Sequence, residues 1–261
     1  PKAEQISRIL DVCRKAGQPW TVIGNGSNLL VGDGGIRGVV LEIGRQIAEI
    51  EIDGTSITAG AGAMLSSIAS KAAQAALTGM EFASGIPGSL GGAVVMNAGA
   101  YGGEMKNILK EVTVLTPEGE LQTLSVEELD LSYRHSIVPE RGYLVIQAVL
   151  ELQPGKPEEI QAIMDDLKEK RVSKQPLEYP SAGSTFKRPE GYFAGKLIQD
   201  AGLRGFQVGG AQVSEKHSGF VINRDHATSA DICNLMDQVS GIVFKKFGVR
   251  LEPEVKKIGE F

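Results

Sequence analysis

The sequence predicts an α+β fold built from several lobes. Segments 48–60 and 111–125 have the alternating patterns and turn residues of two β-hairpins. Stretches with helical periodicity lie before, between and after these hairpins. Residues 153–157, QPGKP, have the composition of a junction between domains. Because hairpins and helices are mixed along the chain, an α+β arrangement is favoured over one doubly wound parallel sheet.

The first half of the chain supplies the elements of the N-terminal lobes. A helix is predicted at 3–16, where four apolar residues recur at helical spacing: Ile6, Ile9, Leu10 and Cys13. Short strands are predicted at 19–24 and 37–43. The first hairpin turns at Asp53-Gly54, a strong turn dipeptide. A helix of small residues is predicted at 63–77, with Gly79 just beyond its end.

The second half begins with the 111–125 hairpin and a strand predicted at 143–152. Residues 158–172 predict an amphipathic helix with four residues on its buried face: Ile160, Ile163, Met164 and Leu167. The remaining predicted elements are a helix at 192–201, a strand at 219–223, a helix capped by Ser229 and ending near Phe247, and a closing strand, VRLEPEV.

The composition limits the classes of function. The chain has 261 residues, 42% of them hydrophobic, and a net charge of −5, which is unfavourable for bulk binding of nucleic acid. No apolar run reaches the roughly 20 residues needed to span a bilayer. The three histidines have no convincing metal-site spacing, so no metal is expected. The chain begins at Pro1 without methionine, and we expect a further segment upstream.

Two glycine-rich segments follow short apolar runs, GNGSN at 24–28 and GIPGSLGG at 85–92. Glycine adopts positive φ freely, so successive N–H groups in such loops can point at one oxyanion. Two loops could hold a diphosphate from two sides. A Rossmann fingerprint is excluded because Leu29 stands where its third glycine belongs. A purely structural role as turns remains open from composition alone.

The polar residues of the second half could bind an anion. The segment SAGSTFKRP at 181–189 is surrounded by lysines and arginines, although the chain as a whole is acidic. Such local positive charge favours an anionic substrate. Arg134 in SYRHS and Glu254 in LEPEV are further candidates. The alternative for all of them is an ordinary solvated surface.

Six motifs, in this order, resemble the UDP-N-acetylenolpyruvoylglucosamine reductase family, also called UDP-N-acetylmuramate dehydrogenases: GNGSNLLV, GIPGSLGGAVVMNAGAYG, SYRHS, AGSTFKRP, AGKLIQDAGLRG and LEPEV. The resemblance covers about residues 5–259 and fits the shorter subtype, which lacks a tyrosine-bearing loop. It implies a three-lobed flavoprotein with a vanillyl-alcohol-oxidase (PCMH-type) FAD-binding fold and a substrate-binding α+β domain.

The resemblance also implies a division into domains. The expected segments are an FAD-binding lobe at 1–44, a second FAD-binding lobe at 45–153, a substrate-binding domain at 154–250 and a C-terminal strand at 251–261 that carries a catalytic glutamate.

The family's reaction is implied in the same way. NADPH reduces FAD, flavin N5 gives hydride to C3 of the enolpyruvyl group, and protonation of C2 yields UDP-N-acetylmuramate for peptidoglycan synthesis. By motif, Arg134 stabilises the charge developing at the carboxylate. Ser184 donates the proton to C2. Glu254 assists at the carboxylate, with its own charge neutralised by a proton or by hydrogen bonding through water.

The resemblance assigns the binding residues as well. The residues expected to bind FAD are Gly24, Asn25, Gly26, Ser27, Asn28, Leu29, Gly85, Ile86, Pro87, Gly88, Ser89, Gly91, Gly92, Asn97, Gly99 and Tyr101. Those expected to bind substrate are Tyr133, Lys174, Lys187, Arg188 and His217.

We expect the partners to be a UDP-sugar and NADPH, without nucleic acid or membrane, and the protein to be a cytoplasmic monomer. Two alternatives remain at this point. One is another FAD-dependent oxidoreductase of the same fold, and the other is a non-catalytic flavin- or nucleotide-binding module.

Overall fold

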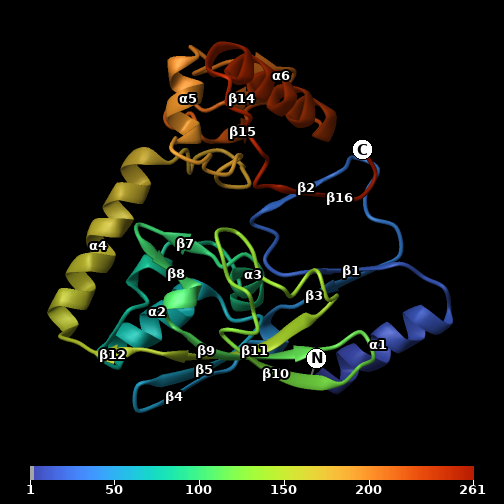
Figure 1. Ribbon diagram of the computed structural model, residues 1–261, viewed down its shortest axis with the longest axis vertical. Helices are drawn as coiled ribbons and strands as arrows, with labels where there is room; N and C mark the ends of the chain where they lie inside the picture. Colours follow the sequence, from blue (N-terminus) through green and yellow to red (C-terminus); the bar gives the residue numbers. More distant parts are fainter. Residues whose placement is uncertain (1–2) are drawn as a thin grey trace. The chain divides into compact units, whose positions relative to one another are not determined.

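The structure is a computed structural model in which residues 3–261 are described. It divides into two compact units. Unit 1 combines the described residues up to Gly26 with Gly38–Glu169, and unit 2 combines Ser27–Arg37 with Lys170–Phe261 (Figure 1). Helices and strands both contribute to each unit, so the predicted α+β class is confirmed.

A five-stranded antiparallel sheet forms the centre of unit 1, in the order β10-β9-β11-β5-β4. Both predicted hairpins are confirmed, and Gly54 turns the first with a φ of 59°. The strand predicted at 143–152 is the central strand β11. The bounds of the strands are β4 (Ile50–Asp53), β5 (Ser56–Gly60), β9 (Leu109–Leu115), β10 (Leu121–Ser125) and β11 (Leu144–Glu151).

Three helices and the sheet bury one common core in unit 1. They are α1 (Ala3–Lys15), α2 (Leu65–Gln74) and α3 (Leu90–Val95). Ile6, Leu65 and Leu90, one from each helix, are completely buried in this core. The helices predicted at 3–16 and 63–77 are therefore confirmed.

Short elements complete unit 1. β1 (Trp20–Ile23) pairs in parallel with β3 (Val39–Glu42). The strands predicted at 19–24 and 37–43 are therefore confirmed. Antiparallel pairs join β6 (Leu77–Thr78) to β12 (Gln153–Pro154) and β7 (Gly99–Ala100) to β8 (Gly103–Glu104). Three 3₁₀ turns are η1 (Arg45–Ile47), η2 (Glu81–Ala83) and η3 (Met105–Asn107).

Helix α4 (Pro157–Lys174) crosses the boundary between the units. Of its predicted buried face, only Ile160 is buried, whereas Ile163 is 46% exposed. The helix itself is confirmed, but its buried face is confirmed only in part, because Met164 packs half-buried against the core of unit 1 while Ile163 is exposed. The apolar stripe continues after the core of unit 1 has ended, and periodicity alone does not report how far a packing partner extends.

Unit 2 has a three-stranded antiparallel sheet in the order β13-β14-β15. Its strands are β13 (Gln207–Val208), β14 (Ala211–Val213) and β15 (Val221–Asn223). Helices α5 (Ala194–Asp200) and α6 (Ser229–Phe247) share a second core with this sheet, in which Leu235 and Val239 are completely buried. None of the helices within residues 3–261 meets the length and hydropathy needed to cross a membrane.

Residues 27–37 belong with unit 2, whereas the sequence analysis expected them in an FAD-binding lobe at 1–44. Strand β2 (Leu29–Val31) pairs in parallel with β16 (Lys256–Ile258). The Asp33 carboxylate also accepts hydrogen bonds from the N–H and the hydroxyl of Ser229, at 2.8 and 2.9 Å. The segments 154–250 and 251–261 likewise share one unit from residue 170 onward. The division of the FAD-binding part into two lobes stays a prediction.

The closing strand predicted at 249–255 is wrong, because the strand is β16 at 256–258. Only an isolated bridge between Phe186 and Pro253 interrupts the irregular path of residues 249–255. Pro253 has no N–H to donate, which prevents a regular ladder at this position.

Helix α6 begins one residue earlier than the sequence suggested. Thr228, not Ser229, is the N-cap, and its hydroxyl accepts the N–H of Asp231 at 3.0 Å. The Asp231 carboxylate accepts the Thr228 N–H in return. This bond and a second one from the N–H of Gly210 lower the pKa of the Asp231 carboxyl. This reciprocal capping box satisfies two N–H groups at the helix start. Gly248, with a φ of 72°, ends the helix.

Replacing Thr228 by alanine should destabilise the protein through α6. We expect Thr228→Ala to lower the free energy of unfolding by about 1 kcal/mol, because the N–H of Asp231 loses its acceptor. Urea denaturation followed by circular dichroism measures this. The matched control Ser66→Ala, at an exposed position of α2, should stay within about 0.5 kcal/mol of the parent. Equal stability of Thr228→Ala and the parent would contradict the capping box.

Candidate active site

The two glycine-rich loops lie side by side in unit 1. The side-chain amide of Asn25 donates to the carbonyl of Pro87 at 2.7 Å. A Cβ atom at Gly24 would overlap the hydroxyl oxygen of Ser89 unless that hydroxyl rotated away, so the two loops are in close contact here. Gly26 has a φ of 70°. The first loop therefore turns directly against the second, and its remaining predicted residues, Ser27, Asn28 and Leu29, continue into unit 2.

Backbone bonds anchor the end of the second loop in the core. The N–H groups of Leu90 and Gly91 donate to Ala63 and Ala61, both at 2.8 Å. Gly91 thus uses its own N–H inside the unit. Ile86 likewise donates to Ala83 at 3.0 Å.

Other N–H groups of the loops remain available. Within residues 3–261, no protein acceptor takes the N–H of Asn25, Gly26, Gly88 or Ser89. Backbone N–H groups that converge in such loops form a concave site for an anion. The predicted role of the two loops as a diphosphate cradle therefore fits their geometry. The rest of the FAD-binding set stays a prediction, apart from Asn97, which is buried and has both N–H donors of its amide occupied inside unit 1.

The end of the motif GIPGSLGGAVVMNAGAYG forms the β7–β8 hairpin. Tyr101 and Gly102 occupy its turn with φ values of 53° and 91°, as in the tight turns that favour such hairpins. A Cβ atom at Gly99 would lie 2.6 Å from the carbonyl oxygen of Gly103, so glycine permits this pairing. Tyr101 is 48% exposed and Asn97 is buried.

Arg134 lies beside this hairpin in unit 1. Its Nη2 donates to the carbonyl of Gly99 at 3.4 Å, and its guanidinium lies 5.2 Å from the ring centre of Tyr133. Its backbone is left-handed, with a φ of 57°. The structure therefore brings together Arg134, Tyr133 and Gly99, which the motifs assigned to the catalytic, substrate-binding and cofactor-binding sets.

Ser184 and Glu254 come together in unit 2. The N–H of Glu254 donates to the carbonyl of Thr185 at 2.8 Å. Thr185 is buried, its hydroxyl accepts the N–H of Val221 at 2.8 Å, and its own N–H donates to Gly219 at 2.9 Å. Ser184 is exposed on this fixed backbone, whereas Glu254 is only 9% exposed.

Asn28 also joins this group in unit 2. Its side-chain amide donates to the carbonyl of Glu254 at 3.2 Å, and its carbonyl accepts the N–H of Lys256 at 2.9 Å. Sequence reasoning missed Thr185, whose burial next to Ser184 cannot be read from a motif.

The predicted substrate-binding cations are also in unit 2. Lys187 forms a 3.4 Å ion pair with Glu252. The guanidinium of Arg188 lies 4.0 Å from the ring centre of Phe193, and its Nε donates to the carbonyl of Tyr192 at 3.3 Å. Both cations follow directly after Phe186, at the end of the segment that carries Ser184.

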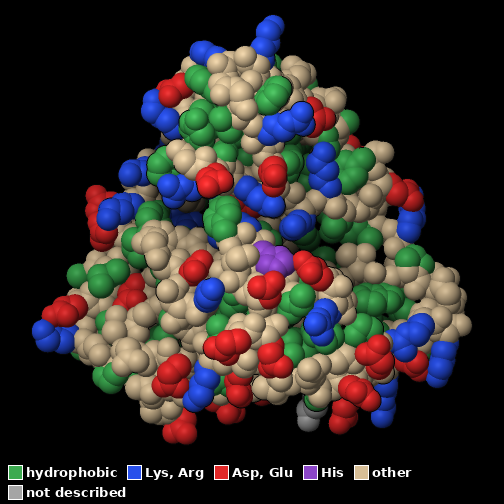
Figure 2. Space-filling view, viewed as in Figure 1, with side chains coloured by type: hydrophobic (Ala, Val, Ile, Leu, Met, Phe, Trp, Pro, Cys, Tyr) green, Lys and Arg blue, Asp and Glu red, His purple; other side chains and the backbone are tan. Residues whose placement is uncertain are grey.

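The two units differ in charge. Unit 2 has 15 Lys and Arg against 11 Asp and Glu, whereas the described residues of unit 1 have 11 against 21. Figure 2 shows one face of the molecule, on which both kinds of charged side chain are exposed. The positive excess of unit 2 favours an anionic ligand there.

Comparisons with known proteins agree along the whole chain. A model described as "UDP-N-acetylenolpyruvoylglucosamine reductase, C-terminal domain" matches residues 175–258, and one described as "FAD binding domain" matches residues 2–125. The UDP-N-acetylenolpyruvoylglucosamine reductase of Agathobacter rectalis is 61% identical, over 100% of this chain and 87% of the relative.

The chain belongs to the UDP-N-acetylenolpyruvoylglucosamine reductase family.

Further relatives of this reductase family support the fold. The reductase of Lachnoclostridium phytofermentans is 57% identical, over 99% of this chain and 85% of the relative. The crystal structure of the reductase from Thermus caldophilus is 36% identical and covers 95% of this chain and 88% of its own, with a TM-score of 0.83. The family resemblance, the flavoprotein fold and the FAD requirement predicted from the motifs are thereby confirmed.

His217 is held as a neutral hydrogen-bond donor in this reductase. Its Nδ1 accepts the N–H of Gly219 at 3.0 Å, which leaves the proton on Nε2. Its ring meets Phe220 edge-on, with 4.9 Å between ring centres. Burial lowers the pKa of His217, and the cations Lys174 and Arg204 lower it further. A neutral His217 therefore has its Nε2–H available as a hydrogen-bond donor.

The pKa of His217 can be tested by NMR. We expect the imidazole to titrate below its ordinary value of 6.5, and Lys174→Gln to raise the midpoint because it removes a repelling cation. Since the folded chain takes up this proton at lower pH than the unfolded chain does, the contribution of His217 to stability falls as the pH drops through 6.5. The control Lys245→Gln, on α6, should leave the midpoint unchanged. A midpoint above 6.5 in the parent would be the opposite result.

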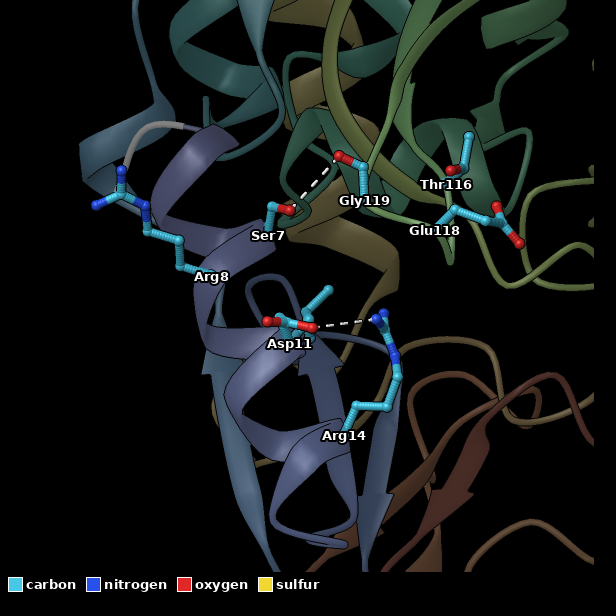
Figure 3. A pocket seen from close by; sticks show the side chains of 8 residues that line it. Ser7, Arg8, Asp11, Arg14, Thr116, Glu118 and Gly119 are labelled. Carbon is cyan, nitrogen blue, oxygen red and sulfur yellow. Dashed lines mark hydrogen bonds and ion pairs between the residues drawn. The ribbon is translucent and has the colours of Figure 1, made fainter.

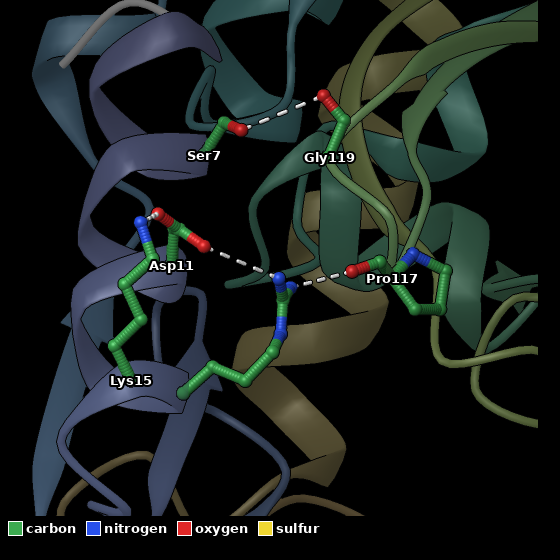
Figure 4. Close-up of polar contacts among 6 residues, drawn as sticks. Ser7, Asp11, Lys15, Pro117 and Gly119 are labelled. Atoms are coloured by element: carbon green, nitrogen blue, oxygen red, sulfur yellow. Dashed lines mark hydrogen bonds and ion pairs between the residues drawn. The ribbon is translucent and has the colours of Figure 1, made fainter.

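A separate small cavity of about 170 Å³ lies between α1 and the turn of the β9–β10 hairpin (Figure 3). Arg14 donates to the carbonyl of Pro117 at 2.6 Å and pairs with Asp11 at 3.5 Å, while Asp11 also pairs with Lys15 at 2.7 Å (Figure 4). None of the predicted site residues lines this cavity. Its polar contacts hold α1 against the hairpin, which is a structural role.

Within residues 3–261, no cluster of three or more His, Cys, Asp or Glu side chains could hold a metal ion.

Proposed function

We propose that the glycine-rich loops hold FAD and that Arg134, Ser184 and Glu254 carry the chemistry by which this oxidoreductase reduces UDP-N-acetylenolpyruvoylglucosamine. The reaction belongs to peptidoglycan precursor synthesis and uses NADPH. The 2.8 Å bond from Glu254 to Thr185 carries the assignment, because it holds the backbones of the two proposed catalytic residues of unit 2 next to each other.

The loops of unit 1 fit an FAD diphosphate. The absence of a Cβ atom at Gly24 lets the loops approach each other, and the N–H groups of Asn25, Gly26, Gly88 and Ser89 are available as donors. When bound, FAD supplies hydride transfer between the nicotinamide and the enolpyruvyl group.

Arg134 is proposed to bind the carboxylate of the enolpyruvyl group. Addition of hydride at C3 places negative charge on C2, and this charge spreads into the neighbouring carboxylate. A fixed guanidinium stabilises that charge as it develops. The contacts of Arg134 with Gly99 and Tyr133 restrict the movement of the guanidinium before the substrate arrives.

Ser184 is proposed to donate the proton to C2. A hydroxyl is a weak acid, but a carbanion delocalised into a carboxylate is a strong base, so the transfer is feasible from a positioned serine. Glu254 is proposed to assist at the carboxylate through a hydrogen bond.

The cations of unit 2 are proposed to bind the diphosphate and sugar of the substrate. Lys174, Lys187 and Arg188 supply positive charge, and His217 supplies a neutral donor. Tyr133 is proposed to contact the substrate beside Arg134.

A monomeric state and a cytoplasmic location stay predictions, which analytical ultracentrifugation and cell fractionation would test.

Replacing Ser184 should separate the two half-reactions. We expect Ser184→Ala to leave anaerobic flavin reduction by NADPH within about twofold and to slow reoxidation by the enolpyruvyl substrate by about 100-fold, the scale of a positioned proton donor. Stopped-flow absorbance of the flavin measures both steps. The control Ser181→Ala, in the same loop, should react as the parent does. Equal slowing of both steps, or reoxidation as fast as in the parent, would contradict the role.

Replacing Gly24 should weaken FAD binding. The added Cβ atom of Gly24→Ala would overlap the Ser89 hydroxyl, which forces that hydroxyl to rotate or the loops to separate. We expect the dissociation constant of FAD to rise about tenfold, equivalent to about 1.4 kcal/mol. Flavin fluorescence titration of the apoprotein measures this. The control Gly241→Ala adds its methyl group in open space on α6 and should bind FAD as the parent does. Unchanged affinity of Gly24→Ala would contradict the cradle.

A further inference from the structure

We propose that Asn97 is a positioning residue for Arg134. Its buried side-chain amide fixes the turn that presents the guanidinium to the substrate. This inference rests on the proposed function, because it assigns to Asn97 a role that acts through Arg134 and not through direct contact with FAD or substrate.

The amide of Asn97 is used entirely inside unit 1. Its Nδ2 donates to the carbonyl of Ser132 and to the Glu104 carboxylate, both at 3.1 Å. Its Oδ1 accepts the N–H of Lys106 at 2.9 Å. The residue is 1% exposed, and both N–H donors of its amide are occupied. The Asn97 side chain therefore joins three chain segments and presents no N–H to a ligand.

The carbonyl of Ser132 closes the turn around Arg134. It accepts the N–H of His135 at 3.1 Å, and Ser132 donates to His135 in return at 3.3 Å. The same carbonyl accepts the amide of Asn97. Arg134 lies inside this turn with a φ of 57°, a conformation that non-glycine residues adopt only when the surrounding structure holds them there.

Further bonds connect the same two segments. Lys106, whose N–H binds Asn97, donates from Nζ to the carbonyl of Leu131 at 3.0 Å. Ser136 donates to the carbonyl of Val95 at 2.9 Å. Asn97 is distinct among these residues because its amide binds both the turn and the backbone of Lys106.

The consequence for the reaction is geometric. A displacement of about 1 Å in a charge-stabilising group can slow a reaction about 100-fold. Loss of the Asn97 amide releases the Ser132 carbonyl and allows the strained turn to relax. The guanidinium of Arg134 would then lose its fixed place, and the half-reaction that depends on it would slow.

The test is a double-mutant cycle in the FAD-loaded enzyme. Asn97→Gly removes the amide and tolerates the φ of 39° at this position. We expect flavin reduction by NADPH to stay within about twofold and reoxidation by the enolpyruvyl substrate to slow about tenfold. In the Arg134→Ala background, Asn97→Gly should slow reoxidation by less than about twofold more, because the group that it positions is already absent.

An equilibrium measurement accompanies the kinetics. Asn97→Gly should weaken binding of UDP-N-acetylmuramate, whose carboxylate Arg134 is proposed to contact, and should not weaken it further in the Arg134→Ala background. Isothermal titration calorimetry of the oxidised enzyme measures this. The control Val112→Ala removes core volume from β9 and should lower stability while leaving both half-reactions and product affinity within about twofold of the parent.

A second variant isolates the bond to Ser132. Asn97→Asp combined with Glu104→Gln lets the new glutamine donate to the new aspartate, and the bond from Lys106 is kept. The donation to the Ser132 carbonyl is replaced by repulsion between a carboxylate oxygen and the carbonyl oxygen. This double variant should reproduce the kinetics of Asn97→Gly. If Asn97→Gly does not fold, the double variant decides whether Asn97 positions Arg134.

The outcomes separate this inference from the proposed function. If an Asn97 variant slows reoxidation by the same factor with and without Arg134, or slows both half-reactions equally, Asn97 does not act through Arg134 and the inference is overturned. If Arg134→Ala itself leaves reoxidation unchanged, the proposed role of Arg134 fails and the inference fails with it.

Discussion

The close approach of the two glycine-rich loops is the constraint on which the proposed chemistry depends. Gly24 faces the Ser89 hydroxyl, which leaves no room for a Cβ atom in its present rotamer, and the Asn25 amide donates to the carbonyl of Pro87. Leu90 and Gly91 anchor the second loop to the core through their N–H groups, while four other N–H groups remain available. A cradle made of backbone suits unit 1, because most of its charged side chains are acidic and backbone dipoles can bind a diphosphate without cationic side chains.

Unit 2 provides positively charged side chains for an anionic ligand, whereas unit 1 provides backbone N–H groups. Its excess of lysine and arginine suits a substrate with a diphosphate and a carboxylate. The buried Thr185 holds the backbone beside Ser184 with three hydrogen bonds, so an exposed serine is displayed from a rigid support. Hydrogen bonds to buried backbone groups fix the position of a neighbouring reactive side chain more firmly than a surface loop would.

The sequence predicted what local patterns determine. The hairpin at Asp53-Gly54, helix α1 and the ordered motifs all depend on neighbours in the chain, and these predictions are confirmed. Features set by distant partners were not predictable. Ile163 has no packing layer, and Asp33 joins unit 2 through Ser229. The Thr228 cap is different, because Asp231 stands only three residues later and the capping box could have been recognised in the sequence. The motif that contains Asn97 does not show which groups its amide contacts, because these contacts form only in the folded chain.

An anaerobic absorbance titration of the purified protein tests the central claim most directly. The account predicts that the protein binds FAD, that its flavin bands bleach on addition of NADPH, and that they return on addition of UDP-N-acetylenolpyruvoylglucosamine with formation of UDP-N-acetylmuramate. Bands that bleach with NADPH and do not return with this substrate, or a protein that takes up no added FAD, would contradict the account.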